Sequence, residues 1–190
     1  MKGRDRVIIG LVGLPGAGKT TVAHYLKQYG FTCVTLSDFI KQEAQKEGVS
    51  DFTREILQNY GNRMRSQQGP AILVEKAIAV LQKQKAKKIV IDGIRNIYEV
   101  EYLQTANHFI LVGVTASPKV RYGRIREKRG KKWIGSYQQF QAAEEREEHL
   151  GSRGIGLRVS ECFKRAAITI VNEGTLADLH QATHQLTHHE

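Results

Sequence analysis

The sequence of 190 residues has few cysteines and no long apolar run, and each shortage excludes a class of protein. Its two cysteines, Cys33 and Cys162, cannot build a disulfide framework and form no CxxC pair, so a reducing cytoplasm is the expected location. The longest apolar runs, 7–12 and 109–114, are far shorter than the about 20 residues that cross a membrane, and we expect no membrane association. With 41% apolar and 25% charged residues, the composition excludes a disordered, collagen-like or coiled-coil chain.

Positive charge is in excess, and most of the excess is concentrated in one segment. The sequence has 29 Lys and Arg residues against 19 Asp and Glu residues, a net charge of +10. Residues 119–132 contain eight basic residues and one acid, which leaves only +3 for the rest of the chain. A positive charge spread over the whole surface would favour a protein that binds nucleic acid. A charge this local instead predicts a binding site for a small anion, such as a polyphosphate.

The pattern of apolar residues predicts one α/β domain that spans residues 1–190. Apolar runs predict strands, and amphipathic stretches predict helices between them. The predicted strands are 6–12, 31–36, 88–91, 108–114 and 167–171. The predicted helices are 18–28, two or three within 38–85, 118–129, 136–149 and one that begins at Thr175. Strands separated by helices favour a parallel sheet that is covered on both faces.

A glycine-rich loop follows the first predicted strand and precedes the first predicted helix. Residues 13–20, GLPGAGKT, match the pattern G-x-x-x-x-G-K-[ST], in which backbone N–H groups surround phosphate oxygens. Lys19 is expected to reach the β- and γ-phosphates, and the Thr20 hydroxyl is expected to bind Mg²⁺. The candidate nucleotide-binding residues are Gly13, Gly16, Ala17, Gly18, Lys19, Thr20 and Thr21. The loop predicts ATP with Mg²⁺ as a ligand and leaves the reaction open.

Two carboxylates follow predicted strands, at the sheet edge where ligands bind in doubly wound folds. Asp38 follows the second strand, where it could orient an acceptor, accept its proton or cap the helix that begins there. Asp92 follows the apolar run 88–91, the position of a Walker B carboxylate that helps to hold Mg²⁺. Arg95, three residues later, is a candidate phosphate-binding residue. The alternative interpretation makes Asp92 a turn residue and Arg95 a surface charge.

Several segments together make the chain resemble a known group of enzymes. They are GLPGAGKTTVA, SDF, TREILQNYGNRMRSQQGPAI, VIDGIRNIYEVE, SPKVRYGRIREKRG and VNEGTLADL, which span nearly the whole sequence. They are similar to P-loop kinases of the nucleoside monophosphate kinase and dephospho-coenzyme A kinase type, and most similar to a largely archaeal branch of that group. The resemblance implies a three-layer P-loop kinase fold with a five-stranded parallel sheet, helices on both faces and a small helical lid.

The resemblance also implies roles for the basic segment and for the helices after the second strand. It implies a lid at 119–135 that closes over ATP and an acceptor-binding helical region at 38–70. The spacing independently suits a lid, because Arg121, Arg124 and Lys128 share one face of a helix. The alternatives for this segment are a solvated helix face and an RNA contact. In the acceptor region, one of Arg54, Arg63 and Arg65 is expected to pair with the acceptor's phosphate, and we choose Arg63 as the candidate.

The sequence therefore predicts a kinase that transfers the γ-phosphoryl group of ATP to a small phosphate acceptor, most simply a (deoxy)nucleoside monophosphate. The predicted catalytic residues are Lys19, Asp38, Asp92, Arg121 and Arg124; the acceptor-binding residues are Asp38, Arg63 and Arg95; the metal ligands are Thr20 and Asp92. One alternative is transfer to a hydroxyl group, as in dephospho-coenzyme A kinases, with Asp38 as the base. Another is a nucleotide-dependent ATPase module that binds RNA. We expect a cytoplasmic monomer or homodimer whose partner is a small molecule rather than nucleic acid.

Overall fold

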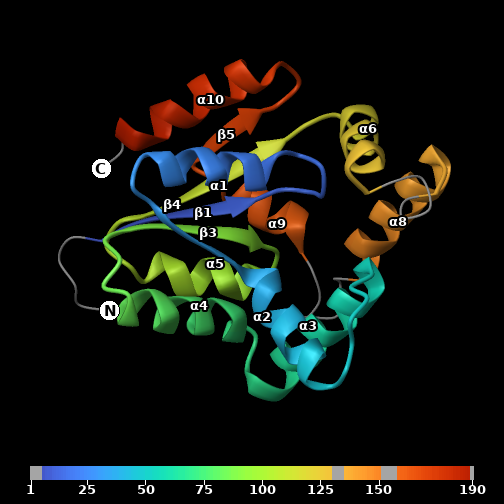
Figure 1. Cartoon of the computed structure of the whole chain (residues 1–190), viewed down its shortest axis with the longest axis horizontal. Helices are drawn as coiled ribbons and strands as arrows, with labels where there is room; N and C mark the ends of the chain where they lie inside the picture. The colour runs from blue at the N-terminus through green and yellow to red at the C-terminus, as the bar shows by residue number, and fades with distance from the viewer. Residues whose placement is uncertain (1–5, 130–134, 151–157, 189–190) are drawn as a thin grey trace.

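The computed structural model describes residues 6–129, 135–150 and 158–188, which build a five-stranded sheet between two layers of helices (Figure 1). The strands are β1 (Val7–Val12), β2 (Thr32–Thr35), β3 (Lys88–Ile94), β4 (Phe109–Thr115) and β5 (Ile168–Val171). Their order across the sheet is β2-β3-β1-β4-β5, and all neighbouring pairs are parallel. The predicted five-stranded parallel sheet with helices on both faces is confirmed.

Each face of the sheet is covered by helices whose apolar sides meet alternate residues of the strands. One layer holds α1 (Lys19–Gln28), α10 (Leu176–Gln185) and the short helix η2 (Leu186–His188), and the other holds α4 (Ile72–Lys83), α5 (Ile97–Gln104) and α9 (Val159–Lys164) (Figure 1). Along β1, Ile9 and Leu11 belong to the core under α1, whereas Ile8 and Val12 belong to the core with α4 and α5. Because successive side chains of a strand point to opposite faces, an unbroken apolar strand requires helices on both sides.

Four further helices stand beyond the carboxyl ends of the strands, where they form two walls (Figure 1). One wall is formed by α2 (Leu36–Lys46) and α3 (Arg54–Gln68), and the other by α6 (Pro118–Arg129) and α8 (Tyr137–Leu150). The first wall covers most of the predicted acceptor region, and α6 covers most of the predicted lid, of which 130–134 lie outside the described residues. In the part of the chain that the structure describes, no helix combines the length and apolarity that a membrane crossing requires.

Two element boundaries differ from the predicted ones and affect the interpretation of the site. Strand β3 continues to Ile94, three residues beyond its predicted end, so Asp92 lies within the strand. Helix α2 begins at Leu36 and its N-cap residue is Thr35, so Asp38 lies in the first helical turn. Of the alternatives for Asp38, the helix cap is therefore wrong, because the chain enters the helix directly from β2 and Thr35 takes the N-cap position.

Candidate active site

The glycine loop follows β1, the central strand, and packs tightly against the neighbouring elements. Gly13 has a φ of 152°, and a Cβ atom there would lie 2.1 Å from the carbonyl oxygen of Val114 in β4. Gly18 has a φ of 106° and is the N-cap residue of α1. Glycine is the residue that these two positions accept without strain. The loop therefore passes directly into α1, whose first N–H groups have no partner within the helix and form a ready site for phosphate oxygens.

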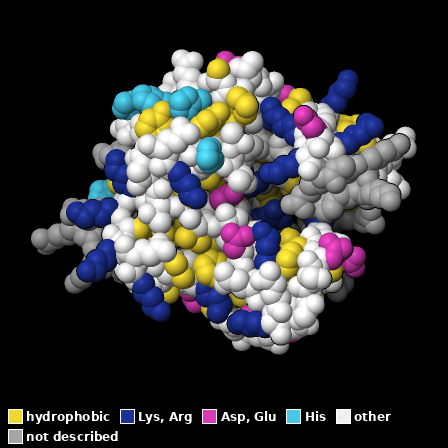
Figure 2. Space-filling model, viewed as in Figure 1, with side chains coloured by type: hydrophobic (Ala, Val, Ile, Leu, Met, Phe, Trp, Pro, Cys, Tyr) yellow, Lys and Arg dark blue, Asp and Glu magenta, His cyan; other side chains and the backbone are white. Residues whose placement is uncertain are grey.

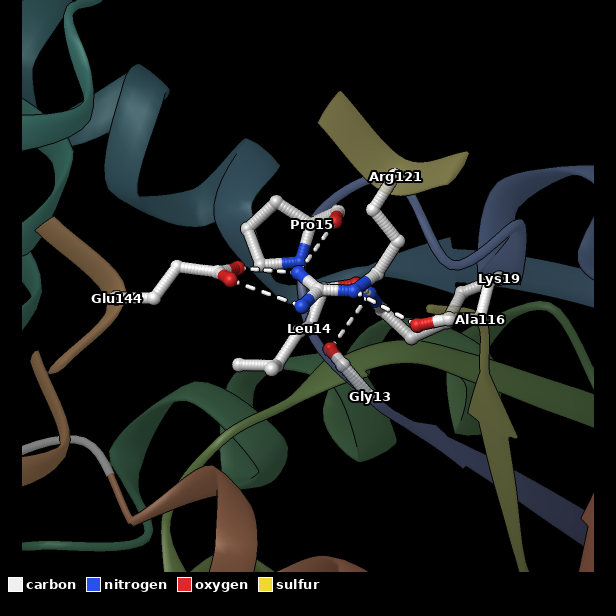
Figure 3. Close-up of polar contacts among 7 residues, drawn as sticks. All are labelled: Gly13, Leu14, Pro15, Lys19, Ala116, Arg121 and Glu144. Atoms are coloured by element: carbon white, nitrogen blue, oxygen red, sulfur yellow. Dashed lines mark hydrogen bonds and ion pairs between the residues drawn. The ribbon is translucent and has the colours of Figure 1, made fainter. Parts of the chain in front are cut away.

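Lys19 lies over the glycine loop and is almost completely buried. Its Nζ donates hydrogen bonds to the carbonyl oxygens of Gly13 (2.7 Å) and Leu14 (3.2 Å) (Figure 3). The pKa of Lys19 is lowered to about 8, mainly because the amine is buried and next because of the positive charge of Arg95. An anionic ligand beside the amine would oppose both effects and stabilise its charged form.

Thr20 and Asp92 place two oxygen groups side by side next to the loop. Thr20 Oγ1 donates a 3.1 Å hydrogen bond to Asp92 Oδ2, although the two residues are 72 positions apart in the sequence. Asp92 is 3% exposed, and its Oδ1 atom is buried without a hydrogen-bond partner among the described residues. A buried carboxylate oxygen with no partner is unfavourable unless a cation binds it. The pair therefore fits Mg²⁺, a hard cation that binds oxygen ligands.

A cavity of about 800 Å³ opens between the glycine loop and the two walls. Lys19, Thr20 and Asp92 all line it, so the predicted phosphate-binding and metal-binding residues face one space. Among the described residues, its lining contains seven basic side chains and two acidic ones: Lys19, Lys41, Arg54, Arg65, Arg95, Arg124 and Lys128, with Asp92 and Glu127. Figure 2 shows basic side chains gathered around the hollow at the centre of this face. A cavity with this excess of positive charge is suited to anionic ligands.

Asn172 joins the glycine loop to α6, the helix of the predicted lid, and sequence reasoning did not identify Asn172. Its side-chain Nδ2 donates a 2.8 Å hydrogen bond to the carbonyl oxygen of Ala17. Arg124 donates from Nη1 to the Asn172 carbonyl oxygen (3.0 Å) and from Nη2 to Asn172 Oδ1 (3.3 Å). Arg124, a predicted catalytic residue, lines the cavity from this anchored position. The signal that could have identified Asn172 is a polar residue directly after the last strand, at the ligand edge of the sheet.

The wall that covers the predicted acceptor region contributes Arg54 and Arg65 to the cavity, and the structure does not bring Arg63 there. Arg65 is 4% exposed, and its Nε and Nη2 atoms donate hydrogen bonds of 3.2 and 2.8 Å to Oε1 of Glu99, which is fully buried. Arg63 lies on the exposed surface of α3 and pairs with Glu47. Two arginines that are two residues apart on one helix therefore have different surroundings, and Arg65 is the one that faces the cavity. Sequence reasoning missed the contribution of Glu99.

Arg121, a predicted catalytic residue, lies beside the glycine loop but is not among the described residues that line the cavity. Its guanidinium forms an ion pair with Glu144 of α8, in which Nη2 lies 2.8 Å from Oε2 (Figure 3). Nε donates a 2.9 Å hydrogen bond to the carbonyl oxygen of Ala116, and Nη1 a 3.4 Å bond to that of Pro15. Arg121 therefore connects α6 both to α8 and to the glycine loop.

Asp38 lies apart from Lys19 and Asp92. Its carboxylate pairs with Lys41 of the same helix at 2.7 Å, and its side chain is 55% exposed. It lines a smaller neighbouring cavity of about 420 Å³, whereas the main cavity is lined at this point by Ser37 and Lys41. The predicted catalytic and acceptor-binding residues therefore fall into two groups. One group lines the main cavity: Lys19, Asp92, Arg95 and Arg124. The other lies outside its lining: Asp38, Arg63 and Arg121.

The parallel sheet, the glycine loop and the adjacent carboxylate are those of the kinase-like P-loop proteins. The chain belongs to the family described as AAA domain, whose family model matches residues 9–149. It also belongs to the UPF0200 proteins. It is 31% identical to one from Pyrobaculum aerophilum, over 87% of each chain, and 27% identical to one from Methanothermobacter thermautotrophicus, over 96% of this chain and 90% of the other.

Solved structures share the fold at low sequence identity. A protein of Thermus thermophilus superposes with a TM-score of 0.65 at 20% identity, covering 97% of this chain and 98% of the other. A shikimate kinase of Acinetobacter baumannii, solved in complex with shikimate, gives a TM-score of 0.55 at 19% identity, covering 96% and 93%. The predicted resemblance to P-loop kinases is confirmed, and the kinase-like fold indicates a phosphotransferase that binds a nucleotide.

Proposed function

We propose that the protein is an ATP-dependent phosphotransferase that moves the γ-phosphoryl group of ATP to a small nucleotide-like acceptor, most simply a (deoxy)nucleoside monophosphate. The observation that carries the proposal is the single cavity lined by Lys19, Asp92, Arg65 and Arg95. Phosphoryl transfer requires two substrates held in line and positive charge around the transferred group. A cavity of about 800 Å³ with this lining supports both requirements.

On the nucleotide side, the chain would bind and orient the triphosphate. The N–H groups of the glycine loop and of the start of α1 would bind phosphate oxygens, and Lys19 would place its charge against the β- and γ-phosphates. Thr20 and Asp92 would hold Mg²⁺, which, when bound, neutralises charge on the phosphate oxygens. Arg124 of the opposite wall adds positive charge from the lid side. These roles are typical of P-loop phosphotransferases, which position the phosphates and neutralise their charge during transfer.

The lining of the cavity favours a phosphate group over a hydroxyl group as the acceptor of the γ-phosphoryl. An ionised phosphate needs neutralisation and no base, whereas a hydroxyl group must lose a proton. Asp92 is the metal-ligand candidate, and Asp38, the predicted base, is exposed and outside the cavity lining. Arg54, Arg65 and Arg95 instead supply positive charge on the acceptor side. Because Asp38 lies outside the lining, this arrangement supports a monophosphate acceptor over transfer to a hydroxyl group with Asp38 as the base.

A panel of acceptors tests the proposal directly. ADP release would be measured with ATP·Mg²⁺ and each ribo- and deoxynucleoside monophosphate, with dephospho-coenzyme A and shikimate as hydroxyl acceptors. Shikimate is included because a shikimate kinase shares the fold. We expect release above the acceptor-free rate with at least one monophosphate, and a phosphorylated product by mass spectrometry. A response to a hydroxyl acceptor alone would contradict a phosphate as the accepting group and would favour Asp38 as the base.

The RNA-binding alternative makes a different prediction in the same assay. An RNA-dependent ATPase would show RNA-stimulated hydrolysis that falls steeply as salt increases. A kinase should show slow hydrolysis without acceptor, no stimulation by RNA and transfer that persists at moderate salt. RNA stimulation without transfer to any acceptor would therefore contradict the proposed kinase.

We also propose a cytoplasmic location. Cys33 and Cys162 are both free thiols, which suits a reducing compartment. Expression of a fluorescent fusion of the full chain, followed by fractionation, should recover it with the soluble cell contents, and recovery from a secreted fraction would contradict this location.

A further inference from the structure

We infer that Glu99 is a positioning residue that fixes the guanidinium of Arg65 in the acceptor wall, so that this part of the cavity selects acceptors with an anionic group. The inference rests on the proposed phosphotransfer, because it concerns the second substrate of that reaction. Glu99 itself does not line the cavity among the described residues, and it acts through Arg65, which does.

Glu99 uses both carboxylate oxygens, and each holds a different segment. Oε1 accepts hydrogen bonds from Nε (3.2 Å) and Nη2 (2.8 Å) of Arg65 in α3. Oε2 accepts from the backbone N–H groups of Arg95 (3.0 Å) and Asn96 (3.1 Å) at the end of β3. One carboxylate therefore fixes the acceptor helix relative to the strand that carries Asp92, the metal-ligand candidate.

Helix capping explains only half of these contacts. Asn96 and Glu99 form a capping box at the start of α5, which engages Oε2. A glutamine serves this purpose as well as a glutamate, because either side chain supplies an acceptor oxygen. The contact of Oε1 with Arg65 is different, since both side chains are buried, at 3% and 0% exposure, and a buried cation requires a charged partner. The carboxylate charge is thus needed for Arg65 rather than for the helix.

The geometry leaves one edge of Arg65 available to a ligand. Glu99 engages Nε and Nη2, and within the described residues Nη1 has no hydrogen-bond partner. An arginine held by one edge is pre-organised to bind a planar or tetrahedral oxyanion through the other. The neighbouring Arg63 lacks this arrangement, because its partner Glu47 is exposed and the pair lies at the surface.

The test is the binding of nucleoside monophosphates to the wild-type protein and to Glu99→Gln, in the presence of a non-hydrolysable ATP analogue. Calorimetry would use the adenosine, guanosine, cytidine and uridine monophosphates as probes. We expect the Kd of the best monophosphate to rise at least about tenfold in Glu99→Gln, because the guanidinium of Arg65 loses the carboxylate contacts that orient it toward the cavity. The Kd of the ATP analogue should change less than about twofold, since the glycine loop is unaltered. Glu47→Gln, which alters the exposed pair on the same wall, should match the wild type in both.

A second variant keeps the inference testable if Glu99→Gln does not fold. Arg65→Lys preserves the positive charge beside Glu99 but removes the two-edged guanidinium, so it should weaken monophosphate binding by a similar factor. Equal weakening of both ligands, unchanged monophosphate binding in Arg65→Lys, or a wild type that binds no monophosphate would overturn the inference. A wild type that binds a monophosphate through Glu99 and Arg65 but does not phosphorylate it would overturn the proposed function alone.

Discussion

The side-chain amide of Asn172 donates a 2.8 Å hydrogen bond to the carbonyl oxygen of Ala17, a residue 155 positions earlier in the glycine loop. Asn172 also accepts two hydrogen bonds from Arg124 of α6. The loop after β5 therefore links the glycine loop to α6, although neither contact is local in sequence. Both contacts lie at the carboxyl edge of the sheet, where the ligand is expected.

Replacement of Asn172 by alanine should weaken both the site and the fold. The change removes the side-chain bonds to the Ala17 carbonyl oxygen and to Nη2 of Arg124, while the bond from Nη1 to the backbone oxygen of residue 172 remains. Because the buried carbonyl oxygen of Ala17 then lacks a partner, the free energy of unfolding should fall by about 1–3 kcal/mol. The affinity for an ATP analogue should fall about tenfold, because the loop and Arg124 lose their common support. Chemical denaturation and ligand titration measure the two effects. Asn107→Ala, at an exposed position, is the matched control and should change neither.

Replacement of Asp92 by asparagine should raise the requirement for Mg²⁺. Asparagine keeps the shape and the oxygen that meets Thr20 but removes the charge that favours a divalent cation. The free Mg²⁺ concentration that gives half-maximal activity should increase at least about tenfold, while binding of the nucleotide without metal should be unchanged or stronger because like charges no longer repel. An unaltered Mg²⁺ midpoint would show that Asp92 does not hold the metal.

Replacement of Asp38 by alanine should have little effect on turnover. Asp38 is exposed, pairs with Lys41 and lies outside the lining of the main cavity, so we expect kcat within about twofold of the wild type. Loss of a first-turn acid should reduce the free energy of unfolding by less than about 1 kcal/mol. Glu43→Ala, which breaks another ion pair of α2, is the control. A fall in kcat of about 10²-fold or more would instead identify Asp38 as a general base.

The two thiols should react slowly in the native protein. Burial raises the pKa of Cys33 to about 11 and that of Cys162 to about 12. Between pH 7 and 9, both should therefore stay protonated in the folded state, and alkylation should be slower than that of a model thiol with an unperturbed pKa of about 8.5. Labelling followed by mass spectrometry should find two reactive thiols only after denaturation. Rapid labelling of either cysteine at pH 7 in the folded protein would show that its thiol is not shielded from solvent and would contradict the raised pKa.

Local signals were sufficient for the sheet and the phosphate loop, and insufficient for the walls of the cavity. The apolar runs and the GLPGAGKT segment predict β1, the loop and α1 because neighbouring residues decide those structures. Arg63 and Arg65 are the same residue type on the same helix, so the sequence does not distinguish them. Their surroundings differ because Arg63 pairs with the exposed Glu47 and Arg65 with the buried Glu99. The segment Asn-Ile-Tyr-Glu at 96–99 has the pattern of a capping box, and this pattern gives no sign that Glu99 also contacts Arg65.

The basic segment that begins in α6 shows the same limit of sequence reasoning. Arg121, Arg124 and Lys128 share a helix face by spacing, and Arg124 and Lys128 do line the cavity. Arg121 instead faces Glu144, which belongs to a helix that follows after residues 130–134. The position of α8 relative to α6 depends on how the two helices pack, and their sequences alone do not specify it.

The most direct test of a phosphotransferase is the transfer of labelled γ-phosphate from ATP·Mg²⁺ to the best acceptor, by the wild type and by Lys19→Ala. Lys19 is buried over the glycine loop and is expected to stabilise charge on the transferred group. We predict one labelled product for each ADP in the wild type, and a rate at least about 10²-fold lower in a folded Lys19→Ala protein. A Lys19→Ala protein that transfers the label at the wild-type rate, or a wild type that hydrolyses ATP without labelling any acceptor, would contradict the account.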